Sequence, residues 1–194
     1  MVEAITNIEV LREIALDQHG FVTTGQALEA GVTYASLSML TKRGRLERVA
    51  HGIYRVPQVP ATQYDRYMLA VLWTGVPEAA LSHDTALDAY GVCDINPTSI
   101  HVTVSKGRRI KRNGGDRYTL HRQDLTAEQI TWWEQIPIVT LPTAIEQCAN
   151  GNTPDYLLTQ AIDNGKRMGL LTDKKADELA NKLQERNDRY LKSR

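Results

Sequence analysis

Cysteine is scarce in this sequence, and the two residues present are not spaced as a metal or redox pair. Cys93 and Cys148 are the only cysteines among 194 residues, and they lie too far apart for the short spacings used by zinc sites and redox motifs. Isolated thiols of this kind are typical of small buried side chains in a reducing compartment. We therefore expect two free, buried thiols and no cysteine-based metal centre.

Long apolar runs are also missing. No stretch is apolar over the roughly 20 positions needed to cross a bilayer, and no charged-then-apolar signal segment opens the sequence. We therefore expect a cytoplasmic protein with no membrane partner. With 42% hydrophobic and 24% charged residues, the chain fits one large domain or two small ones. The formal net charge is zero, so only the placement of the charges can point to a nucleic-acid partner.

The N-terminal part of the sequence has the pattern of a winged helix-turn-helix. Residues 3–17 form an amphipathic helical pattern whose outer face is acidic. A short helix over 24–31 and a second one over 33–44 follow, each with a threonine at its start and a glycine at its end. Two short strands within 46–56 then turn through a glycine, as a tight hairpin requires.

The second of these short helices predicts contact with a DNA groove. Leu37 and Leu40 point inward, with Tyr34 or Met39 as a further inward residue, and small polar side chains occupy the outer face. Small donors suit a helix inserted into the major groove, while neighbouring cations can neutralise phosphates. The predicted DNA-binding residues are Thr33, Tyr34, Ser36, Ser38, Lys42, Arg43, Arg45, Arg48, His51 and Arg55.

After a proline-bracketed linker at 57–60, the pattern is mixed. Helices are expected at 64–73 and 82–90, and the strands 100–104 and 118–121 are expected to pair as a hairpin. The loop between these strands holds a second basic patch of Lys106, Arg108, Arg109, Lys111 and Arg112. This loop could contact DNA phosphates or an acidic protein, or it could be a solvated loop. Three further helices are expected between residue 143 and the C-terminus.

Signals for catalysis are weak. Ser82, His83 and Asp84 are catalytic residue types, but neighbours on a helix point in different directions and do not build a triad. The other histidines, His51, His101 and His121 among them, are scattered, and no cluster has metal-ligand spacing. The sequence therefore predicts no catalytic residues, no metal site and no cofactor.

Several segments together resemble the AbiEi-type antitoxins. The first is the wing, Gly44-Arg45-Leu46-Glu47-Arg48-Val49-Ala50-His51-Gly52-Ile53-Tyr54-Arg55-Val56. The others are Leu81-Ser82-His83-Asp84-Thr85-Ala86-Leu87, the stretch 97–104 and Ile136-Pro137-Ile138-Val139-Thr140. These segments cover most of the chain, from about residue 8 to 150.

The resemblance implies an antitoxin of a type IV toxin–antitoxin, abortive-infection system. Such a protein would repress its own operon by binding promoter repeats through the winged helix, with possible self-association on DNA. It would also counteract a cognate nucleotidyltransferase-like toxin, with or without direct contact. The expected fold is α+β, with a winged helix at 1–57 and, at 58–194, a mixed α/β antitoxin domain containing a small antiparallel sheet.

Two other classes of function are left open by the residues. In one, the winged helix targets an enzyme, such as a nuclease or a toxin-modifying enzyme, although the clustered carboxylates that a metal-dependent nuclease needs are not evident. In the other, the winged helix binds protein instead of DNA. Compared with these two alternatives, a non-enzymatic DNA-binding antitoxin fits the sequence best.

Overall fold

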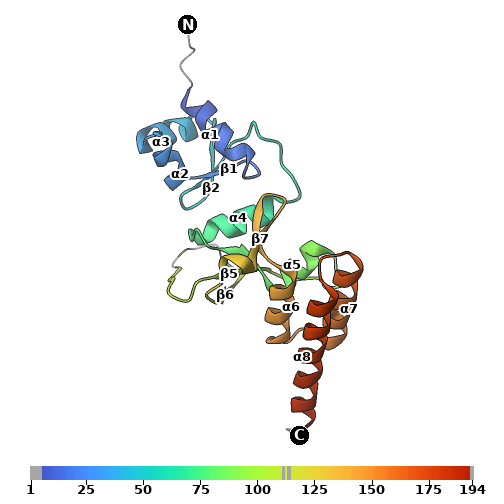
Figure 1. Cartoon of the computed structure of the whole chain (residues 1–194). Helices are drawn as coiled ribbons and strands as arrows, with labels where there is room; N and C mark the ends of the chain where they lie inside the picture. Colours follow the sequence, from blue (N-terminus) through green and yellow to red (C-terminus); the bar gives the residue numbers. More distant parts are fainter. Residues whose placement is uncertain (1–5, 111, 113–114, 193–194) are drawn as a thin grey trace. The chain divides into compact units, whose positions relative to one another are not determined.

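The computed structural model describes residues 6–110, 112 and 115–192 (Figure 1). The chain divides into two compact units. The first unit comprises Met1–Ala79, Gly107–Asp116 and Glu134–Ile136, and the second comprises Ala80–Lys106, Arg117–Trp133 and Pro137–Arg194.

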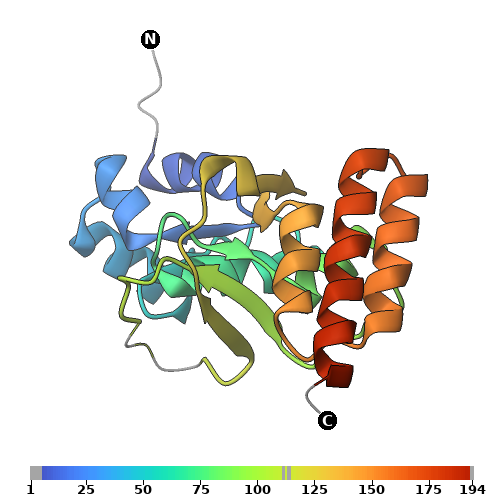
Figure 2. The same cartoon turned by 60° about the horizontal axis from the view of Figure 1, so that its bottom comes forward.

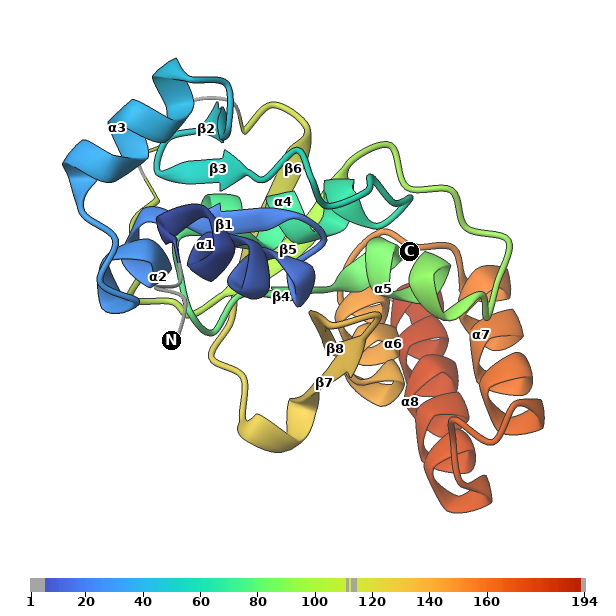
Figure 3. The same cartoon turned by 90° about the horizontal axis from the view of Figure 1, so that it is seen from above.

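The first unit has the element order of a winged helix followed by one more helix. Its elements are α1 (Asn7–Leu16), β1 (Phe21–Thr23), α2 (Thr24–Glu29), α3 (Tyr34–Lys42), β2 (Glu47–Ala50), β3 (Ile53–Arg55) and α4 (Asp65–Thr74). The strands form an antiparallel sheet in the order β1-β3-β2, and Figure 3 shows them beside α3. The α+β class and the N-terminal winged helix predicted from the sequence are confirmed.

The wing is the β2–β3 hairpin. Gly52 turns the chain with a φ of 70°, a left-handed conformation that glycine adopts without the steric cost of a Cβ. The pairing shifts register between Arg48 and Ala50, which is where a bulge strengthens the local twist.

A single apolar core joins the helices of the winged helix to its sheet. The buried residues are Leu11, Ala15, Val22, Ala27, Val32, Leu37, Leu46, Val56 and Val59. Ile8, Ile14 and Leu40 pack against this core while partly exposed. Leu37 and Leu40 therefore lie on the inner side of their helix, as the sequence pattern predicted.

The second unit combines a sheet with α-helices and a short 3-10 helix. Its elements are β4 (Ala80–Leu81), α5 (His83–Tyr90), β5 (Ile100–Val104), β6 (Tyr118–Arg122), η1 (Ala127–Gln129), β7 (Ile130–Trp133), β8 (Ile136–Val139), α6 (Leu141–Ala149), α7 (Asp155–Arg167) and α8 (Asp173–Lys192). The last three helices pack on one another and lie side by side in Figure 2. Among the described residues, no helix combines the length and the apolar character that a membrane span requires.

Strand pairing in the second sheet is mixed. The order is β6-β5-β4-β8-β7, with β4 antiparallel to β5 and parallel to β8. The strands β5 and β6 pair in parallel over their whole length, so the expected hairpin between them is wrong. A parallel pair needs a crossover between its strands, and here the chain of 105–117 supplies it.

Candidate nucleic-acid interface

Helix α3 begins at a threonine cap and presents most of its surface to solvent. The Thr33 hydroxyl accepts a hydrogen bond from the Ser36 amide (3.2 Å), which satisfies one of the free amides at the helix start. Leu37 is the helix's one buried residue and anchors it to the core. Leu40 packs partly buried against the same core, so the opposite face of the helix is free to enter a groove.

Tyr34 and Met39 lie on the free face of α3. Their exposed fractions are 66% and 44%, so neither supplies the further inward residue that the sequence pattern suggested. Ser38 is exposed as well, whereas the Ser36 hydroxyl accepts from Thr33 Oγ1 (3.1 Å) and from Asn7 Nδ2 (3.0 Å). Of the two serines, Ser38 is therefore better placed to reach a ligand.

Four exposed cations follow the free face of α3 into the wing: Lys42, Arg43, Arg45 and Arg48. The ion pairs formed among the described residues include none of these four side chains. The exposed His51 lies at the wing tip, with its Nδ1 3.4 Å from Arg48 Nη2. Their positive charge is therefore not compensated by a paired carboxylate.

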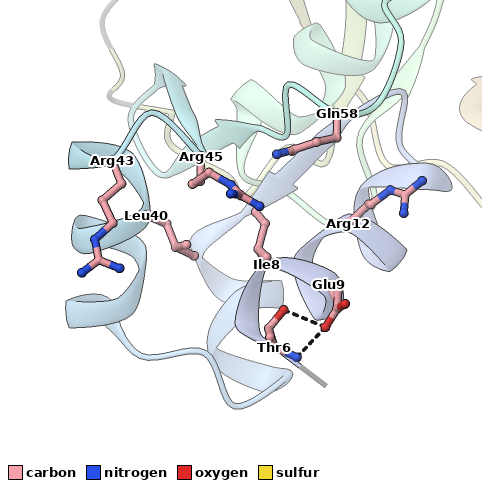
Figure 4. A pocket seen from close by; sticks show the side chains of 8 residues that line it. All are labelled: Thr6, Ile8, Glu9, Arg12, Leu40, Arg43, Arg45 and Gln58. Carbon is pink, nitrogen blue, oxygen red and sulfur yellow. Dashed lines mark hydrogen bonds between the residues drawn. The ribbon is translucent and has the colours of Figure 1, made fainter. Parts of the chain in front are cut away.

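A hollow of about 810 Å³ lies beside these cations and is shown in Figure 4. Arg43 and Arg45 line it from the α3–β2 connection, and Arg12 lines it from α1. Glu9 is the acidic residue of its lining; hydrogen bonds from the Thr6 side chain and backbone lower the Glu9 pKa. The carboxylate thus remains charged, but it is already engaged in the capping box of α1.

Arg55 has a structural role that the sequence analysis did not foresee. Its guanidinium forms an ion pair with Asp65 (2.7 Å) and donates to the carbonyls of His19 (3.3 Å) and Val59 (3.1 Å). Its side chain is only 15% exposed, and it also lies over the Phe21 ring. Because its donors are used inside the first unit, we leave Arg55 out of the candidate interface.

The second basic patch also contains both side chains that are bonded within the protein and side chains that are exposed. Arg108 pairs with Glu78 (3.1 Å), and Arg112 donates to the carbonyl of Trp73 (2.9 Å). Lys106 and Arg109 are exposed, and Lys111 lies outside the described residues. Two of the five basic side chains therefore contact other parts of their own unit.

In the second unit, the fold gathers three histidines that the sequence separates. His101 on β5, His121 on β6 and His83 at the start of α5 each offer one nitrogen, and these nitrogens lie within 4.8 Å of one another. The expectation that His101 and His121 are scattered is wrong, because His121 Nε2 lies 3.2 Å from His101 Nδ1. The expected pairing of 100–104 with 118–121 was the available signal, because neighbouring strands bring His101 and His121 close together whichever direction they run.

Burial makes these imidazoles neutral. Desolvation lowers the His83 pKa to about 3 and the His121 pKa to about 4, with the neighbouring histidines adding to the shift. Desolvation also lowers the pKa of His101. His83 further holds a φ of 51°, a left-handed backbone that costs a non-glycine residue about 1 kcal/mol or more.

The side chains of the adjacent Ser82, His83 and Asp84 do not connect in a single hydrogen-bonded chain. The Ser82 hydroxyl lies 3.0 Å from His83 Nδ1, but the Asp84 carboxylate is turned toward Cys148 and Thr153. Both cysteines are free, and burial raises the pKa of Cys93 to about 11 and that of Cys148 further. These thiols are therefore protonated near neutral pH.

Comparison with known proteins gives a family match for the winged helix. Residues 9–57 match the family described as "Transcriptional regulator, AbiEi antitoxin", which confirms the resemblance to AbiEi-type antitoxins over the winged helix. None of the curated proteins matches the chain. Among solved structures, the RV2827C protein from Mycobacterium tuberculosis has a similar fold, with a TM-score of 0.53 at 17% identity over 92% of this chain and 72% of that one.

Proposed function

Because residues 9–57 match a family of antitoxin transcriptional regulators, we propose that this chain is a DNA-binding antitoxin that represses its own operon. In this proposal, residues 1–57 bind promoter repeats, with self-association on the DNA, and residues 58–194 counteract a cognate nucleotidyltransferase-like toxin. The chain acts in the cytoplasm and has no catalytic role. The matched family is a regulatory one, which supports a protein that acts by binding.

The observation that carries the DNA-binding part is an exposed helix beside uncompensated cations. Helix α3 buries only Leu37, and the four cations that follow its free face lack an ion-pair partner among the described residues. Phosphate contacts of such cations position a protein on DNA, while side chains on the inserted helix read base edges. In this arrangement, Ser38 and Tyr34 face the major groove.

The wing and the end of α3 contact the sugar-phosphate backbone in this proposal. Arg43 and Arg45 lie where the chain leaves α3, and Arg48 lies on β2 beside the wing tip. Thr33 and Ser36 form the capped start of α3. Their hydroxyls orient the helix and do not contact base edges in this proposal. The candidate contacts are Thr33, Tyr34, Ser36, Ser38, Lys42, Arg43, Arg45, Arg48 and His51.

The proposal is tested with the double variant Arg45→Ala/Arg48→Ala. Fluorescence anisotropy with a fragment of the chain's own promoter measures affinity over a series of salt concentrations. We expect weaker binding to every sequence and a plot of log K against log salt that is less steep by about 1 for each lost phosphate contact. Ser38→Ala should instead change the preference between promoter variants while leaving the salt slope unchanged.

A matched control removes the same amount of charge elsewhere. Arg167→Ala/Lys174→Ala takes two exposed cations from the second unit, and it should leave both affinity and salt slope as in the wild type. If the Arg45/Arg48 variant binds the promoter with wild-type affinity and slope, the groove assignment is wrong. Equal losses in the test and control variants would show that only net charge matters.

A further inference from the structure

We propose that His83, His101 and His121 form a binding site for one zinc ion, with a fourth coordination position open to water or to an oxygen ligand. The site lies wholly in the second unit and is separate from the proposed DNA interface. Neutral imidazole nitrogens favour Zn²⁺ over Mg²⁺ and Ca²⁺, which prefer oxygen ligands. Three protein ligands with one open position is also the arrangement of catalytic zinc sites, whereas structural sites have four.

Strand register places two of the imidazoles on one face of the sheet. In the parallel β5–β6 pair, His101 lies opposite Thr119, and Thr103 lies opposite His121. Residues two apart in a strand share a face, so both histidines project to the same side. Helix α5 packs on β5 and starts at His83, which brings the third imidazole to that face.

The distances are close to those of a metal site. Two nitrogens bound to a tetrahedral zinc at about 2.0–2.1 Å lie about 3.4 Å apart. His101 Nδ1 and His121 Nε2 are 3.2 Å apart, and all three ligand nitrogens lie within 4.8 Å. The His83 and His121 rings are stacked, with centroids 3.4 Å apart and planes at 14°, so the His83 ring must turn out of the stack when the metal binds.

The surroundings of His83 would orient this ligand. The Ser82 hydroxyl lies 3.0 Å from its Nδ1, which leaves Nε2 as the metal ligand. The His83 amide donates to Gln147 Oε1 (3.3 Å), and Gln147 Nε2 donates in turn to Gln123 Oε1 (2.8 Å). These bonds hold the left-handed start of α5 in place while the ring moves.

Nearby acidic and thiol groups are occupied elsewhere. The Asp84 carboxylate accepts hydrogen bonds from Thr153 Oγ1 (2.9 Å) and from Cys148 Sγ (3.4 Å). It therefore affects the three histidines only through its charge. Among the described residues, the group that can share a metal ion consists of the three histidines alone. The fourth position is therefore left to solvent or to an incoming ligand.

The experiment uses the full chain without a polyhistidine tag, stripped of metal with a chelator. Cobalt, a spectroscopic substitute for zinc, is titrated in while its visible absorption is recorded, and zinc is then added as a competitor. We expect one cobalt per chain with the intense bands of a tetrahedral site, displaced by zinc. Zinc should also raise the melting temperature of the wild type.

The test variant and its control replace two histidines that have the same backbone conformation. His83 and His19 both have a φ of 51°, and asparagine tolerates this conformation well. His83→Asn should lower metal affinity by at least about tenfold and abolish the thermal shift, and His19→Asn should retain both. His101→Gln repeats the test at a position without backbone strain. Absence of a tetrahedral cobalt spectrum in the folded wild type, or an undiminished one in His83→Asn and His101→Gln, would overturn the proposal.

Discussion

At the residue scale, two arginines on the wing have different roles because their guanidinium groups have different neighbours. Arg48 on β2 is exposed and has no ion-pair partner among the described residues, whereas Arg55 on β3 reaches Asp65. Sequence pattern alone grouped the two arginines, because Asp65 lies in the helix that follows the winged helix. The local motif contains no information about this distant carboxylate.

We expect Arg55→Met to lower the free energy of unfolding by about 2 kcal/mol. The variant leaves Asp65, which is 19% exposed, without its cation, and it leaves the His19 and Val59 carbonyls without a donor. Urea unfolding measures the loss. Arg48→Ala is the matched control and should change stability by no more than about 0.5 kcal/mol, because its side chain is exposed. Equal stabilities of the two variants would contradict a structural role for Arg55.

The cluster of three histidines was not predictable from the spacing of its residues in the sequence. His83, His101 and His121 follow no known ligand spacing, because they lie on three elements that are far apart in the sequence, α5, β5 and β6. The expected hairpin of 100–104 with 118–121 would also have brought His101 close to His121, but no local signal placed His83 and α5 against the same face of the sheet. A site assembled by non-local pairing is therefore hidden from a search for spaced motifs.

At the element scale, the winged helix was predictable because its signals are local. Apolar periodicity, threonine caps and glycine turns lie within each helix or hairpin, so the helices near 24–31 and 33–44 and the strands near 46–56 were placed within a few residues. The strand β1 was missed, since its three residues exist as a strand only by pairing with β3. The second sheet was mispaired for the same reason.

Helix α3 depends on its cap, and Thr33→Ala should cost about 1 kcal/mol of stability. The substitution removes the acceptor for the Ser36 amide and the partner of the Ser36 hydroxyl. Thr33→Ser keeps the hydroxyl and should stay within a few tenths of a kcal/mol of the wild type. Chemical denaturation of the three proteins distinguishes them. If alanine and serine are equally tolerated, the cap contributes little to the orientation of α3.

At the scale of the whole molecule, the two units carry different chemistry. The candidate DNA contacts lie in the first unit, and the histidine cluster lies in the second. The family match covers residues 9–57 alone, so the antitoxin role of the remaining chain depends on the proposal. If the roles are divided in this way, a change in one unit should impair one role and spare the other.

This division predicts that Arg45→Ala/Arg48→Ala separates repression from toxin neutralisation. Both side chains are exposed in the first unit, so their loss should remove phosphate contacts without disturbing the second unit. In cells, a promoter–reporter fusion should show derepression by the variant, while growth during expression of the adjacent toxin should be rescued as by the wild type. Immunoblots confirm equal protein levels. A variant that loses growth rescue at wild-type abundance would instead show that neutralisation depends on the DNA-binding face itself.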